Sequence, residues 1–120
     1  MEQIKLFDSE LRLMELIWQQ DSTTAKNISL IAADIIGWNK NTTYTVLKKL
    51  IKKGAIERIE PNFVCKPLIT REQVQLDETR KLIDKLYNGS VKTFFTSFLK
   101  KENLSKEEIE ELKDIIGKEL

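Results

Sequence analysis

The feature that most constrains the fold is the segment NKNTTYTVLKKLIKKG, residues 39–54, which predicts a helix with two sharply different sides. Asn39 is a favoured N-cap residue and Gly54 is the residue type that most often follows a helix end, so we expect the helix to span residues 40–53. At 100° per residue, one side carries Thr43, Val46, Leu47, Leu50 and Ile51. The opposite side carries Asn41, Thr45, Lys48 and Lys52, with Thr42, Tyr44 and Lys49 beside them. Such a helix buries its apolar side and leaves its polar side open.

A β-hairpin is predicted directly after this helix. Two short segments, residues 55–60 and 63–68, contain β-branched and aromatic residues and flank the turn dipeptide Pro61-Asn62. Pro67 is placed where it closes the second strand.

Two further helices are predicted before residue 39. The first begins near Ser9, with Asp8 or Ser9 as its N-cap, and runs to residue 20. Its buried stripe is Leu11, Met14, Ile17 and Trp18. Residues 21–24 form a polar break, and Thr24 caps a second helix over residues 25–36 that Gly37 stops. Its apolar side is Ile28, Ile31, Ala32 and Ile35. Three helices followed by a hairpin predict a winged helix-turn-helix.

From residue 70 onward the sequence predicts helices only. Thr70 to Gln73 and Ser105 to Glu108 are capping boxes, and residues 88–90 (Asn-Gly-Ser) interrupt the chain between them. We therefore expect a mostly α chain with a winged-helix DNA-binding domain over residues 1–69. A three-helix dimerisation domain is expected over residues 70–120.

The second domain is too small to bury its own apolar residues, because a segment of this size hides too little of its surface internally. We therefore expect a homodimer built by this domain. The predicted interface consists of Leu76, Leu82, Ile83, Leu86, Tyr87, Phe94, Phe95, Phe98, Ile109, Leu112 and Ile116.

Composition argues against an enzyme, a metal site or a cofactor site. The chain has no histidine, the commonest general base and metal ligand. Its single cysteine cannot build a thiolate metal site, and its four scattered glycines form no phosphate-binding loop. No apolar run approaches the ~20 residues that span a bilayer, and the N-terminus lacks the pattern of a secretory signal. We expect a cytoplasmic protein without membrane insertion. Cys65, Trp18 and Trp38 are interpreted as packing residues.

Charge is concentrated in one segment, although the net charge of the chain is +1. Residues 40–66 hold seven basic and two acidic side chains, a net +5, whereas residues 70–120 hold ten basic and eleven acidic ones. This asymmetry favours a polyanionic partner. The alternatives are a solvated lysine-rich surface and a winged-helix module that binds an acidic protein.

The predicted DNA-binding residues are Asn41, Thr42, Tyr44, Thr45, Lys48, Lys49 and Lys52 on the helix, and Arg58 and Lys66 on the hairpin. Near the N-terminal end of the helix, Asn and Thr can bond to base edges, while the later lysines, among them Lys53, attract phosphate.

Four stretches together resemble the penicillinase-repressor family of winged-helix transcriptional regulators, in its BlaI/MecI branch. They are SELRLMELIW, WNKNTTYTVLKKLIKKGAIER, CKPLITREQ and FLKKENLSKEEIEELKDII. The resemblance implies a homodimeric repressor of palindromic operators, with Asn41, Thr42, Tyr44 and Thr45 at the contact positions of the recognition helix. Thr42 and Thr45 match the family pattern, whereas relatives often carry basic residues in place of Asn41 and Tyr44.

The resemblance also implies a response to β-lactams. In the antibiotic-responsive members a membrane sensor-transducer leads to cleavage of the repressor in its dimerisation domain, and the aligned bond here is Ser97–Phe98. The copper-responsive branch uses a cysteine-rich C-terminal motif, and this chain has no cysteine after Cys65. We therefore expect control of β-lactam resistance genes rather than a metal response.

Overall fold

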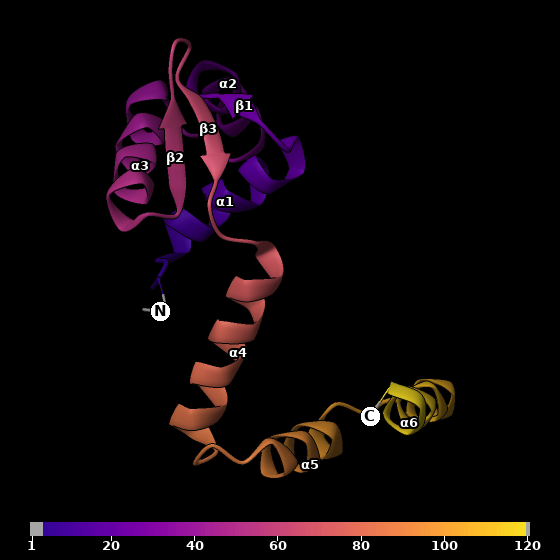
Figure 1. Cartoon of the computed structure of the whole chain (residues 1–120). Helices are drawn as coiled ribbons and strands as arrows, with labels where there is room; N and C mark the ends of the chain where they lie inside the picture. The colour runs from indigo at the N-terminus through magenta and orange to yellow at the C-terminus, as the bar shows by residue number, and fades with distance from the viewer. Residues whose placement is uncertain (1–3, 120) are drawn as a thin grey trace. The chain divides into compact units, whose positions relative to one another are not determined.

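The computed structural model describes residues 4–119 and contains two compact units, one ending at Asp77 and the other starting at Glu78 (Figure 1). The first unit holds α1 (Asp8–Gln20), β1 (Thr23–Thr24), α2 (Ala25–Ile35), α3 (Lys40–Lys53), β2 (Ile56–Ile59) and β3 (Val64–Pro67). Helix α4 (Arg71–Leu86) begins in the first unit and ends in the second, which also holds α5 (Val91–Lys101) and α6 (Lys106–Glu119). The predicted domain boundary after residue 69 stays a prediction.

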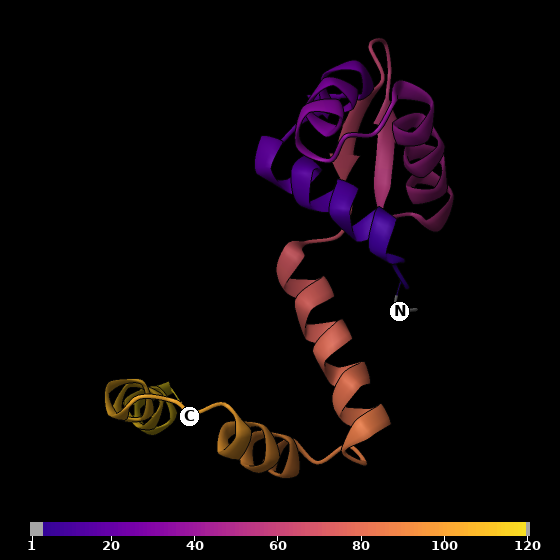
Figure 2. The same cartoon turned by 180° about the vertical axis from the view of Figure 1, so that it is seen from behind.

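The predicted fold class is confirmed: the chain is mostly helical, with three helices and a β-hairpin in the first unit. The sheet, however, has a third strand in the order β1-β3-β2, all antiparallel. The sequence analysis did not predict this third strand: within the predicted polar break of residues 21–24, Thr23 and Thr24 pair with Cys65 and Val64. Helices α1 and α2 lie behind the sheet in Figure 1 and in front of it in Figure 2.

Local capping sets most helix ends where the sequence predicts them. The side chains of Thr24 and Asn39 accept hydrogen bonds from the N–H groups of Asn27 (3.1 Å) and Thr42 (2.8 Å). Gly54 adopts φ 80° just after α3, a left-handed conformation that glycine takes at little cost. Helix α1 differs from the prediction, because its N-cap is Phe7 rather than Asp8 or Ser9.

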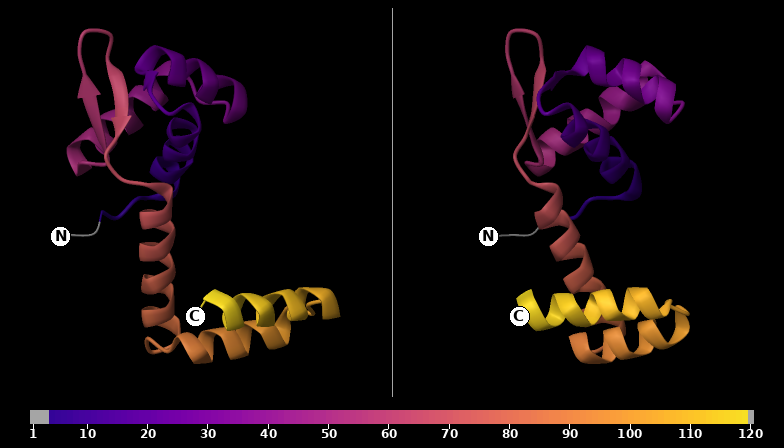
Figure 3. Two further views of the ribbon diagram at one scale, coloured as in Figure 1. Left: turned by 45° about the vertical axis from the view of Figure 1, so that its right-hand side comes forward. Right: turned by 90° about the vertical axis from the view of Figure 1, so that its right-hand side faces the viewer.

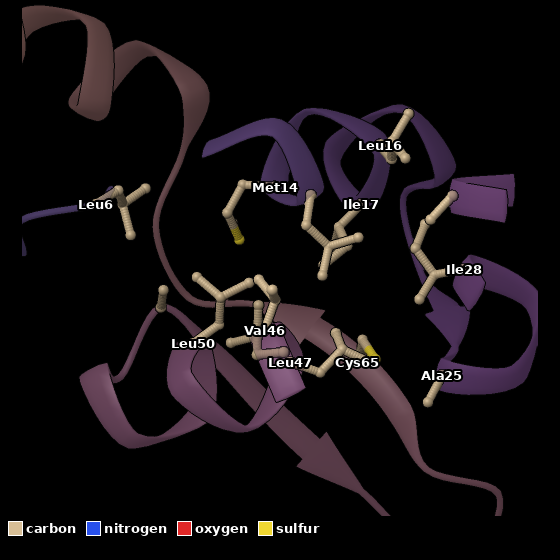
Figure 4. Close-up of a cluster of buried hydrophobic side chains, with 14 of the residues drawn as sticks. Leu6, Met14, Leu16, Ile17, Ala25, Ile28, Val46, Leu47, Leu50 and Cys65 are labelled. Atoms are coloured by element: carbon tan, nitrogen blue, oxygen red, sulfur yellow. The ribbon is translucent and has the colours of Figure 1, made fainter. Parts of the chain in front are cut away.

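The core of the first unit forms where α1, α2, α3 and β3 converge (Figure 4). Met14 and Ile17 from α1 meet Leu47 from α3 and Cys65 from β3, and all four are fully buried. The predicted apolar side of α3 is confirmed, with Thr43, Val46, Leu47 and Leu50 buried. The stripe predicted for α1 is partly wrong: Leu13 and Leu16 are buried, while Leu11 and Trp18 are only half-buried. Ile35 of α2 is exposed.

The second unit consists of the later part of α4 together with α5 and α6, which follow each other through a short connection (Figure 3). Both predicted capping boxes form: Thr70 and Gln73 exchange hydrogen bonds of 2.9 and 3.1 Å, and Ser105 and Glu108 exchange bonds of 3.2 and 3.1 Å. Among the residues of this unit whose burial is described, only Ile83 is buried. The unit thus leaves most of its apolar side chains in contact with solvent.

No helix in the described part of the chain is long and apolar enough to cross a membrane. Over the same residues, no cluster of three or more histidine, cysteine, aspartate or glutamate side chains is arranged to hold a metal ion.

Candidate nucleic-acid interface

Helix α3 presents a continuous polar surface on the side opposite the core. Six of the seven predicted DNA-binding residues of this helix are exposed: Asn41, Thr42, Thr45, Lys48, Lys49 and Lys52. The helix contains no acidic residue. Its exposed side therefore combines hydrogen-bonding side chains at the N-terminal end with uncompensated positive charge further along.

The N-terminal end of this surface is hollowed. Asn41, Thr42, Thr45 and Lys49 line an open depression together with Ser9 of α1 and Trp38. Trp38, which also lines the depression, is half-buried and packs against the core. The depression collects neutral donors and acceptors beside one ammonium group, which is the chemistry that a polar, anionic partner requires.

Thr45 has its hydroxyl hydrogen directed at its own helix, because Oγ1 donates to the carbonyl oxygen of Asn41 at 2.8 Å. Back-bonding of this kind is common for threonine in helices. The side chain consequently offers outward a methyl group and an acceptor lone pair. A thymine methyl is a suitable partner for the first and a base amino group for the second.

Tyr44 lies apart from this set. Its ring meets the ring of Phe63 edge to face, with 5.9 Å between centroids and an interplanar angle of 88°. Lys40 Nζ lies 5.7 Å from the centroid of the Tyr44 ring. Tyr44 is thus half-buried between α3 and the hairpin, whereas the other predicted residues of α3 are open to solvent.

Lys53 does not belong to the exposed basic surface, contrary to the expectation that it attracts phosphate. Its ammonium group pairs with Glu10 Oε1 at 2.6 Å, donates to the carbonyl oxygen of Lys5 at 2.7 Å and lies 4.2 Å from the centroid of the Phe7 ring. Glu10 is buried, with 1% of its side chain exposed, and also accepts a hydrogen bond from the N–H of Phe7 at 2.7 Å. The positive charge of Lys53 is therefore neutralised by the buried carboxylate of Glu10.

The hairpin carries the two remaining predicted residues, Arg58 and Lys66, and both are exposed. Arg58 pairs with Glu60, and its guanidinium lies 3.9 Å from the centroid of the Phe63 ring. Lys66 stands opposite Glu57 in the register of β2 and β3. Each cation of the hairpin thus has an acidic neighbour, and the excess positive charge of this region belongs to α3.

Two residues that shape this region were missed by the sequence reasoning. Glu10 follows the helical spacing of the buried residues Leu13, Met14 and Ile17, and a carboxylate at such a position is a signal for a buried ion pair. Phe63 gives no comparable signal, because its partners Arg58 and Tyr44 are identified only by the folded positions of the hairpin and α3.

The residues interpreted as packing residues occupy packed positions. Trp18 is half-buried and donates from Nε1 to the carbonyl oxygen of Ile69 at 3.0 Å. Cys65 is fully buried, and burial raises the pKa of its thiol to about 11, against a smaller opposite effect of Arg58. A thiol of this kind stays protonated and unreactive near neutral pH.

Comparison with known proteins places the chain in a family. The family model described as penicillinase repressor matches residues 6–118. The chain belongs to the penicillinase repressor family. The methicillin resistance regulatory protein MecI of Staphylococcus aureus (strain N315) is 30% identical over 116 residues, which cover 95% of this chain and 94% of that protein. The penicillinase repressor of Bacillus licheniformis is 30% identical over 114 residues, covering 93% and 89%. The family is one of transcriptional repressors, not of enzymes.

Solved structures of the family resemble the N-terminal part of the chain. The solution structure of the DNA-binding domain of the repressor BlaI aligns with a TM-score of 0.55 at 30% identity, covering 61% of this chain and 93% of that one. The monomeric form of BlaI from Bacillus licheniformis in complex with the blaP half-operator aligns with a TM-score of 0.52 at 30% identity and the same coverage. The winged helix of this family member is therefore similar to one that has been solved on DNA.

Proposed function

We propose that this penicillinase-repressor family member is a sequence-specific DNA-binding repressor that acts as a homodimer on palindromic operators. The observation that carries the proposal is the division of α3, whose apolar side is buried while Asn41, Thr42, Thr45 and three lysines stand exposed without an acidic neighbour in the helix. A relative with a similar winged helix binds a half-operator, which supports the same role for this surface.

In this proposal the two ends of α3 have different tasks. Asn41, Thr42 and Thr45 lie near the N-terminal end, the part of a recognition helix that reaches base edges in the major groove. Lys48, Lys49 and Lys52 follow along the same side and meet phosphates, which makes binding depend steeply on salt. Arg58 and Lys66 of the hairpin add contacts beside the helix, weakened by their acidic neighbours.

The test is a binding titration with two labelled duplexes, one selected from a random pool by the chain itself and one of random sequence. We expect binding to both at low salt, a marked preference for the selected duplex, and a loss of affinity as salt rises. A module that binds an acidic protein instead would leave both duplexes unbound at low salt, and that result would refute the proposal.

The homodimer is supported by exposed apolar side chains on α4, α5 and α6. Of the predicted interface residues, Leu76, Leu82, Leu86, Phe95, Phe98, Ile109 and Ile116 are exposed in the single chain, and Tyr87, Phe94 and Leu112 are half-buried. Ile83 is buried within its own unit, so it contributes through packing beneath the interface. Burying such residues against a second copy removes apolar area from water, which favours association. Sedimentation at micromolar concentration tests this, and a folded monomer would contradict it.

We further propose that the target genes confer β-lactam resistance and that a sensor-transducer pathway relieves repression by cutting Ser97–Phe98. The proposal rests on the names of the relatives, a methicillin resistance regulator and a penicillinase repressor. Both residues are exposed within α5, so a protease has access once that helix opens locally. Cleavage would divide the helix and lower affinity, because two linked half-site contacts gain from effective concentration. The repressor would work in the cytoplasm, where bacterial operators lie. Intact protein in β-lactam-treated, induced cells would rule this switch out.

A further inference from the structure

Between the hairpin and the N-terminal part of α3, four side chains contact one another in a row that we call the ladder: Arg58, Phe63, Tyr44 and Lys40. The guanidinium of Arg58 lies 3.9 Å from the centroid of the Phe63 ring, Phe63 meets Tyr44 edge to face at 5.9 Å, and Lys40 Nζ lies 5.7 Å from the Tyr44 ring centroid. Cation–ring and edge-to-face ring contacts are both attractive at these separations. The ladder therefore holds two cations and two rings in one fixed order across the gap between two elements.

Phe63 is also fixed through its backbone. Its carbonyl oxygen accepts a hydrogen bond from the N–H of Ala25, the first residue of α2, at 2.9 Å. Its φ of 52° lies in the left-handed region, which a bulky residue adopts only where its surroundings demand it. Phe63 thus joins the end of the hairpin connection to α2 by its main chain and to α3 by its ring.

We propose that Phe63 is a positioning residue for DNA recognition, acting by clamping the Tyr44 ring so that the hairpin and α3 meet DNA as one rigid surface. This inference rests on the proposed function and deepens it. Tyr44 accordingly works through its ring rather than by reading a base with its hydroxyl group. Base discrimination is left to Asn41, Thr42 and Thr45, which line the open depression.

The proposal assigns a physical cost to losing the clamp. A surface whose binding arrangement is populated only part of the time has its affinity lowered by that fraction. The contact energy of one aromatic pair corresponds to about a 3- to 10-fold change in Kd. Because no phosphate contact is lost, the dependence of affinity on salt stays unchanged.

The experiment compares full-length variants on the selected and random duplexes. Phe63→Leu and Tyr44→Leu each remove one ring, the double variant removes both, and Tyr44→Phe keeps the ring while deleting the hydroxyl. Phe7→Leu is the matched control, since Phe7 is an exposed ring against Lys53 and not part of the ladder. Thermal unfolding of every variant verifies that each is folded.

We expect Phe63→Leu and Tyr44→Leu each to weaken binding to the selected duplex about 3- to 10-fold. The double variant should bind no less tightly than the single variant with the lower affinity, because both substitutions remove the same contact. Tyr44→Phe and Phe7→Leu should bind like the unsubstituted chain. Three results would overturn the proposal: a loss in Tyr44→Phe equal to that in Tyr44→Leu, unchanged affinity in folded Phe63→Leu, or additive losses. If the unsubstituted chain binds neither duplex, the proposed function itself has failed, and this is seen before any variant is compared.

Discussion

Lys52 is exposed on the proposed DNA-binding side of α3, whereas the adjacent Lys53 pairs with the buried carboxylate of Glu10. Substituting each lysine in turn should therefore have different effects on DNA binding and on stability. Replacing Lys53 with methionine keeps the aliphatic stem but leaves Glu10 as a buried carboxylate held only by the N–H of Phe7. Breaking a buried pair from one side costs about 3–5 kcal/mol, and the partial exposure of Lys53 (28%) places the cost near the lower limit. We expect Lys53→Met to lower the free energy of unfolding by about 3 kcal/mol.

Two companion variants separate the charge of Glu10 from its shape. Glu10→Gln still accepts from the N–H of Phe7 and leaves Lys53 able to turn toward water, so it should cost only about 1 kcal/mol. The double variant, Glu10→Gln with Lys53→Met, should cost less than the sum of the two single variants, because the unpaired buried charge has gone. Lys52→Met, exposed on the neighbouring position, should stay within about 0.5 kcal/mol of the unsubstituted chain.

The assays are urea unfolding for the free energy of unfolding, thermal unfolding for Tm, and a salt titration of DNA binding. Lys53→Met should lower Tm by about 12 °C or more for a unit of this size, without changing the salt slope. Lys52→Met should leave Tm unchanged and reduce the slope by about 0.9, the contribution of one phosphate contact. Unchanged stability in Lys53→Met would refute the assignment of its charge to Glu10. A reduced salt slope in the same variant would refute the separation of the two roles.

Three further predictions concern single positions. Thr45→Ala removes the methyl group and the acceptor, so it should change the preferred bases in a selection from random duplexes while leaving the salt slope intact, and an unchanged preference would exclude Thr45 from base reading. Phe95→Asp places a charge on an exposed ring position of α5, so sedimentation should show monomer where the unsubstituted chain is dimeric, whereas a persisting dimer would move the interface elsewhere. Cys65 keeps its proton in the folded chain up to about pH 11 but loses it near pH 9 when unfolded, so the unfolded state gains stability as pH rises between these values. The free energy of unfolding should fall across that range, and Cys65→Ala should show a smaller fall; an equal fall in both would assign the effect to other groups.

The sequence predicted those features that depend on neighbouring residues. The ends of α3 followed from Asn39 and Gly54, whose capping roles need only a few residues on either side. The division of α3 into buried and exposed sides followed from the helical spacing of its apolar residues. The family resemblance was confirmed by the match over residues 6–118.

Features that depend on distant segments could not be predicted in this way. Strand β1 has only two residues, and Thr23 and Thr24 form a strand because Cys65 and Val64 of β3 lie beside them. The contact between Phe63 and Tyr44 likewise joins the hairpin to α3 through the folded chain. The roles of the site residues and of the second unit in dimerisation stay predictions, which the variants above test.

The measurement that tests the central claim most directly is the stoichiometry and specificity of the complex with the selected duplex, obtained by sedimentation of labelled DNA with increasing protein. We predict that two chains bind one palindromic duplex, and that replacing Asn41, Thr42 and Thr45 together with alanine abolishes the preference over random DNA while leaving the two-chain complex on both. A single chain per duplex, or a preference that survives the loss of all three side chains, would contradict the assignment of α3 as the reading element of a dimeric repressor.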